Sequence, residues 1–206
     1  MLTRPRPPED MAEGRLDALG FQAAPDLREW VLATFLDEDS SLHNPDHVHL
    51  KVASIGFLWS SVLNVRAGKQ VLGQAEFRPP SGTMGKWARA RAEQQLHAWF
   101  GRSPDFLITL DARYAAAASD AAFCALVEHE LSHCGQENDE FGGPRFRKSS
   151  GLPVFCLRAH DVETFVGVAA RYGPIDPGVQ ELLNALSKPK LFSDKDIAIS
   201  CGTCSR

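Results

Sequence analysis

The sequence lacks the long hydrophobic run that a membrane span requires. Its longest apolar stretches, such as residues 121–127, fall well short of the roughly 20 residues needed. The first residues carry charge and proline but no apolar segment, unlike a secretory signal peptide. Neither charge sign dominates, since 22 Lys and Arg stand against 26 Asp and Glu, for a net charge of −4. These absences predict a soluble, cytoplasmic protein that is not a general nucleic-acid coat.

Cysteine is also scarce. The five residues have an odd number and a spacing that do not fit a small disulfide-bonded secreted domain. Cys201 and Cys204 form a terminal Cys-x-x-Cys pair, which supplies half of the ligands of a zinc ribbon. A flexible tail and a site completed across a dimer are both open interpretations of this pair. The composition is otherwise close to the globular average, so the 206 residues predict one compact domain with irregular ends, or at most a domain plus a small appendage.

Proline, glycine and charged residues mark the ends of that domain. We expect a loose leader over residues 1–25, a domain over 26–174 and a tail over 175–206. Hydrophobic periodicity predicts its elements. The first part of the domain is expected to contain a helix over 26–37 capped by Asp26, a loop over 42–48, and strands near 55–61 and 70–77 joined as a hairpin by a turn at 66–69. A helix over 86–100, a strand over 105–111 and a helix from Asp120 to Cys134, capped by Asp120, follow. The remaining elements are an edge strand over 154–157, a helix over 160–172 and a weak helix over 178–186.

The predicted helix over residues 86–100 has an apolar and a basic side. Trp87, Leu96, Trp99 and Phe100 are expected to be buried, and Gly101 to end the helix. Basic residues recur on the other side of this helix. They could contact phosphate, but a solvated helix face is the favoured interpretation.

A His-Glu-x-x-His motif, formed by His129, Glu130 and His133, lies inside a predicted helix. Residues four apart lie one above the other on a helix, so both imidazoles can reach one metal ion. Glu130 lies on the flank of that face, where its carboxylate can contact a water on the metal. Zinc lowers the pKa of such a water toward ~7, and the carboxylate accepts its proton as the water attacks a carbonyl. The apolar surroundings favour this interpretation over two surface histidines on an ordinary helix.

A catalytic zinc usually takes three protein ligands and leaves one position open. The downstream candidates are His160, Asp161 and Glu163. We expect His160 to be the third ligand, because it lies on the polar side of its predicted helix. Glu163 is the alternative. The acids could instead accept a hydrogen bond from a ligand imidazole.

A second group of histidines lies upstream, at His43, His47 and His49. His47 and His49 would share one side of a strand. A second metal site is one interpretation, but a hydrogen-bonded loop is favoured.

The run ALVEHELSHCG, a Gly- and Pro-rich excursion and then HDVETFVGVAARYG resemble the phage metallopeptidase family. More distantly, the chain is similar to the SprT-like (Spartan-type) zincins. The resemblance covers residues 26–173, although the stretch after His133 is longer than in the SprT-like proteins. It implies His129, His133 and His160 as zinc ligands and Glu130 as general base. It also implies an α+β, zincin-like fold, in which a small mixed or antiparallel sheet packs on the active-site helix with covering helices.

The sequence therefore predicts a zinc-dependent metallopeptidase that hydrolyses protein or peptide substrates. The resemblance places it in a bacterial host cell, encoded by a phage or prophage, and the lack of a long apolar run predicts no membrane partner. A SprT-like, DNA-associated protease is an alternative, which the net charge of −4 disfavours. A non-catalytic phage or prophage module stabilised by zinc is the other. Glu130 favours the enzyme, because a purely structural site has no use for a base there.

Overall fold

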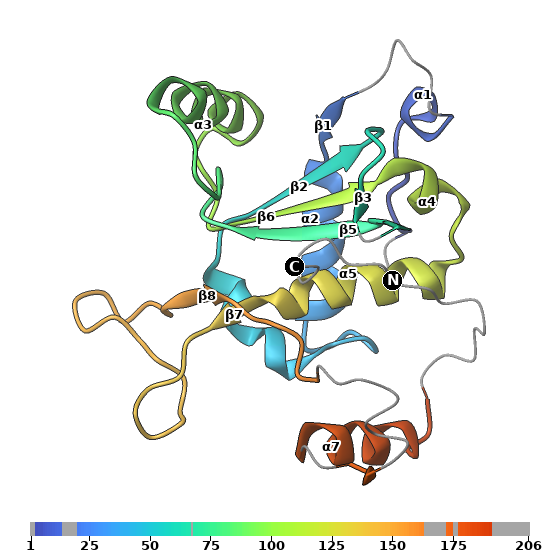
Figure 1. Ribbon diagram of the computed structural model, residues 1–206, viewed down its shortest axis with the longest axis vertical. Helices are drawn as coiled ribbons and strands as arrows, with labels where there is room; N and C mark the ends of the chain where they lie inside the picture. The colour runs from blue at the N-terminus through green and yellow to red at the C-terminus, as the bar shows by residue number, and fades with distance from the viewer. Residues whose placement is uncertain (1–2, 14–19, 67, 163–171, 175–176, 191–206) are drawn as a thin grey trace.

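The structure is a computed structural model. It describes residues 3–13, 20–66, 68–162, 172–174 and 177–190. Helices and strands are both present in a mixed α+β arrangement around one sheet (Figure 1). Within the described ranges, no helix is long and apolar enough to cross a membrane.

A four-stranded sheet in the order β1-β2-β6-β5 forms the centre of the fold. Its strands are β1 (Phe21–Ala23), β2 (Ile55–Ser60), β5 (Gly73–Phe77) and β6 (Phe106–Asp111). β2 and β6 are parallel, whereas β1 and β5 run antiparallel to their neighbours. The sheet is therefore small and mixed, as the sequence predicted.

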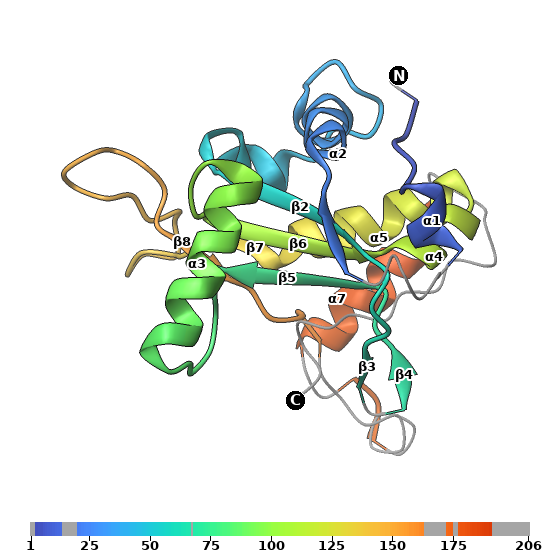
Figure 2. The ribbon, with the colours of Figure 1, turned by 90° about the horizontal axis from the view of Figure 1, so that it is seen from above.

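The predicted hairpin between residues 55–61 and 70–77 is wrong, because β6 lies between β2 and β5. Every residue of β2 is buried, and such a strand takes an internal position with a neighbour on each side. The chain between them forms its own two-stranded ribbon from β3 (Val65–Arg66) and β4 (Lys69–Gln70). This ribbon projects from one end of the sheet (Figure 2).

Most of the helices cover one face of the sheet (Figure 1). They are α2 (Pro25–Val31), the π-helical turn η2 (Leu32–Leu36), the 3-10 helix η3 (Pro45–Val52), α4 (Ala112–Ala117) and α5 (Asp120–His133). Apolar side chains from these helices and from the strands form one large core beneath the sheet. α5 lies under β5 and β6, so a helix carrying the His-Glu-x-x-His motif packs on the sheet.

Several expectations about helix ends on this face are wrong. Asp26 does not cap α2, because Pro25 already occupies the first helical turn and Ala24 is the capping residue. Ser119, rather than Asp120, caps α5, since its side chain accepts a hydrogen bond from the Ala122 amide. The loop expected over 42–48 instead contains the start of η3, where the Asn44 side chain accepts a bond from the Asp46 amide.

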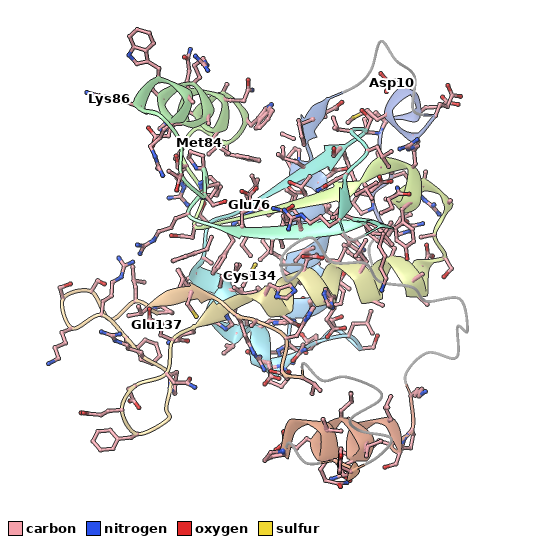
Figure 3. The ribbon with its side chains drawn as sticks, viewed as in Figure 1. Asp10, Glu76, Met84, Lys86, Cys134 and Glu137 are labelled. Carbon is pink, nitrogen blue, oxygen red and sulfur yellow. The ribbon has the colours of Figure 1, made fainter. Side chains whose placement is uncertain are left out.

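Helix α3 (Lys86–Phe100) crosses one end of the sheet on the opposite face (Figure 2). Its bounds are those predicted, and Gly101 ends it in a left-handed conformation with φ 72°. Its burial is not as predicted. Leu96 is buried, but Trp87 is 82% exposed. Lys86, the first residue of α3, lies on the side of the helix away from the strands (Figure 3).

The described part of the expected loose leader packs against the domain. It contains a short helix, α1 (Glu9–Ala12), and β1, which pairs with β2. The Arg4 side chain is only 4% exposed and bonds to Asp120 and to the carbonyl oxygens of Ala115 and Ala118. An arginine in a proline-rich segment gave no sign of this burial in the sequence.

After α5 the chain forms a hairpin of β7 (Cys134–Gln136) and β8 (Phe155–Leu157), followed later by α7 (Pro177–Leu186). The predicted edge strand and the weak C-terminal helix are thus confirmed. The helix expected over 160–172 is not present at residues 160–162, and residues 163–171 lie outside the described part. Cys201 and Cys204 also lie outside it.

Candidate metal centre

The centre is built on the last turns of α5. Ser119 caps this helix and residues 121–127 are apolar, so Leu126 and Val127 are completely buried under the sheet, as is Leu131 within the motif. That packing fixes which way the helix faces. His129 and His133 are one turn apart on a single side of it, as their spacing requires.

Three imidazoles converge at this point. The Nε2 atom of His129 lies 3.3 Å from that of His133 and 3.3 Å from that of His160. The three rings together place one nitrogen each within 4.8 Å of one another, a spacing that could hold a metal ion. His133 is buried, His129 is half-buried and His160 is exposed, so the group opens to solvent on the side of His160.

His133 is oriented by the backbone of Arg158. Its Nδ1–H donates to the Arg158 carbonyl at 2.7 Å, and the Arg158 amide donates to the His133 carbonyl at 2.9 Å. A carbonyl oxygen only accepts, so in the neutral ring the proton is on Nδ1 and the lone pair is on Nε2. That lone pair faces the other two rings, which is the arrangement that a metal ligand needs.

Glu130 is completely buried beneath β5, in close contact with Gly73. A Cβ atom placed on Gly73 would lie only 2.7 Å from Glu130 Oε1 and 2.9 Å from its Cγ. No residue other than glycine fits here without moving the carboxylate. Sequence reasoning did not single out Gly73; a glycine inside a strand pattern is the signal that could have marked it.

The comparisons with known proteins agree with this geometry. The family described as "Putative phage metallopeptidase" matches residues 28–187, which is most of the chain. The chain belongs to this family. Neither the curated proteins nor the solved structures that were compared with the chain include a match. The comparisons thus support the phage metallopeptidase resemblance and not the SprT-like one, and the family's name indicates a peptidase that uses a metal.

The region that the family model matches includes η3, which lies against the end of α5. The side-chain Nδ2 of Asn44 donates to Glu128 Oε1 at 2.9 Å, and the Nε2–H of His49 donates to the Cys134 carbonyl at 2.7 Å. Burial lowers the pKa of His47 to about 4, so this ring is neutral at pH 7. His47 and His49 lie on a 3-10 helix, not on one side of a strand as the metal-site interpretation required.

Other candidates take different positions. The Asp161 carboxylate accepts a hydrogen bond from Arg158 at 2.5 Å, and Glu163 lies outside the described residues. Among the residues that the structure describes, one group of three His, Cys, Asp or Glu side chains has its atoms close enough together to hold a metal ion. It consists of His129, His133 and His160. Burial also raises the pKa of Cys124 to about 11 and that of Cys134 well above its ordinary value. Both thiols are therefore protonated at neutral pH and are poor metal ligands.

Proposed function

We propose that this family member is a zinc-dependent metallopeptidase in which His129, His133 and His160 hold the metal. The observation that carries the proposal is the convergence of three Nε2 atoms, two pairs of which lie 3.3 Å apart. Three imidazoles with one open position are the donor set of many catalytic zinc sites. The hydrogen bond from His133 Nδ1 to Arg158 supports it, because it fixes the ring in the ligating tautomer.

Zinc, when bound, would act as a Lewis acid that lowers the pKa of a water and polarises a peptide carbonyl. Glu130 would accept the proton of the attacking water and donate it to the leaving amine. Its burial beneath β5 supports this role, because a carboxylate held by packing loses little freedom when the substrate arrives. The exposed side of the triad, at His160, would admit the protein or peptide chain.

The metal is tested first. Purified protein should contain about one zinc per chain by mass spectrometry of its metals. The double variant His129→Ala/His133→Ala should contain none, while His97→Ala, on the distant α3, should keep the metal. Full zinc occupancy in the double variant would overturn the ligand assignment.

Catalysis is tested separately. Glu130→Gln keeps the size of the side chain and removes its capacity to accept a proton. We expect it to retain zinc and to lose at least about 100-fold in cleavage of a proteome-derived peptide library read by mass spectrometry. Equal turnover in Glu130→Gln and wild type would exclude Glu130 as the base.

A further inference from the structure

We propose that His49 is a positioning residue that holds the β7–β8 hairpin so that His160 reaches the other two imidazoles. The inference rests on the proposed function for its ligand set. His49 lies on η3, far from the His-Glu-x-x-His motif in sequence, and the proposed reaction gives it no part.

His49 contacts both strands of the hairpin. Its Nε2–H donates to the Cys134 carbonyl, the first residue of β7, at 2.7 Å. Its ring also lies against Phe155, the first residue of β8, with the ring centres 6.4 Å apart. One side chain therefore joins η3 to each of the two strands where the hairpin meets the core.

The accepting carbonyl is one that the fold has to satisfy. The last carbonyl groups of a helix have no partner within the helix, and Cys134 is the capping residue at the end of α5. Cys134 is also buried, so water has little access to this group. A buried carbonyl without a donor is unfavourable, because it has lost its hydrogen bond to water and gained none in return. The His49 ring supplies the donor, and this fixes where the chain leaves α5.

The hairpin carries that position to the third imidazole. Cys134 pairs with Leu157, and the next residue along is Arg158. Its amide donates to the His133 carbonyl, and its carbonyl accepts from the His133 ring. His160 follows two residues later. A shift of Cys134 would thus be transmitted through one strand pair to His160, while His129 and His133 would stay on a helix fixed by the core.

Asn44 supports the same arrangement from the other end of the motif. Its side chain donates to Glu128, the residue before His129, while His49 bonds to the residue after His133. Asn44, which caps η3, and His49 within η3 therefore contact the chain on both sides of the two ligand histidines. The contacts at Glu128 hold the helix, and those of His49 hold the departing hairpin.

A double-mutant cycle on zinc affinity tests the role of His49. We expect His49→Ala to weaken zinc binding about 10- to 100-fold, measured by competition with a chromogenic chelator. In a His160→Ala background the same change should cost less than about twofold, because the ligand it positions is gone. His49→Gln, which keeps an N–H donor, should recover most of the affinity. His43→Ala, on the preceding loop, is the control and should match the wild type.

An equal loss in both backgrounds would show that His49 acts only on general stability, and would overturn the proposal. So would an unchanged affinity in His49→Ala. Amide hydrogen exchange on the zinc-free chain is the second measurement. His49→Ala should speed exchange at residues 134–136 and 155–158 and leave the amides of β2 unchanged, and uniform or unchanged exchange would contradict it.

The failure of this inference is distinguishable from that of the proposed function. If the wild type binds no zinc, or if the His129→Ala variant binds zinc as tightly as the wild type, the ligand set is wrong. The exchange experiment still reports whether His49 holds the hairpin. If zinc binds through His129 and His133 but the cycle shows no coupling, the positioning role alone is wrong.

Discussion

The carboxylate of Glu130 and the backbone of Gly73 are in direct contact, with no room for a methyl group between them. Gly73→Ala should therefore displace the carboxylate from its place beneath β5. Because the proposed reaction needs this group in one position, we expect cleavage to fall about 10- to 100-fold while zinc content stays unchanged. The measurement is turnover of the peptide library together with metal content.

A matched control is available at Gly20, where an added Cβ would meet nothing within 4 Å. Gly20→Ala should cleave at the wild-type rate. If Gly73→Ala retained full activity, the position of Glu130 would not depend on Gly73, and the proposed role of the carboxylate would be weakened.

Arg4 should contribute to stability far more than its place near the N-terminus suggests. Arg4→Met leaves the buried Ala115 carbonyl without its donor and removes a guanidinium that lies 4.4 Å from the centre of the Phe123 ring. We expect a loss of about 2 kcal/mol in the free energy of unfolding, measured with urea. Arg6→Met should cost less than about 0.5 kcal/mol, because its side chain is mostly exposed. Equal effects of the two changes would contradict the role of Arg4 as an anchor.

His47 should make the folded state sensitive to mild acid. Burial, with a smaller contribution from the neighbouring His49 ring, lowers its pKa from 6.5 to about 4, so the unfolded chain takes up a proton that the folded chain does not. The stability present above pH 6.5 is lost as the pH falls toward 4, by about 2 kcal/mol at pH 5. Urea unfolding of wild type and His47→Leu at pH 7 and pH 5 measures this loss. A difference between the two proteins that did not change with pH would refute it.

Trp87 should act as an exposed reporter on α3. With 82% of it accessible, Trp87→Phe should change the free energy of unfolding by less than about 0.5 kcal/mol and remove most iodide-quenchable fluorescence. Trp59→Phe, in the core, should instead lower stability by about 1–3 kcal/mol and leave the quenching intact. Quenching that persists in Trp87→Phe would mean that another tryptophan is the accessible one.

Local signals were enough to predict the elements that carry the motif. α3 has the predicted bounds, and it ends at Phe100 because Gly101 stops it. α5 ends at His133, one residue before the expected end. The spacing of His129 and His133 placed their rings together, since a helix brings residues four apart to one face. His160 also lies with them, although it follows β8 rather than opening a helix.

Long-range pairing was the part that the sequence did not reveal. β6 lies between β2 and β5 because the fully buried β2 takes an internal position with a neighbour on each side. The local sequence pattern could not show this, and it predicted that β2 and β5 pair as a hairpin. Trp87 was misplaced because an apolar residue at the right helical spacing says nothing about how far the sheet extends beneath it. Arg4 and Gly73 are placed by contacts with residues distant in the sequence, and neither set of contacts produces a periodic pattern.

The β7–β8 hairpin also affects how relatives of this protein can be recognised. Once Cys134 pairs with Leu157, the separation of His133 and His160 in space no longer depends on how many residues lie beyond the pair. Lengthening such a loop costs little, because closure entropy grows only slowly with length. Evolution is then free to insert or delete residues between 137 and 154. A search pattern with a fixed interval between the second and third histidines would miss such relatives, whereas one that allows a variable interval would retain them.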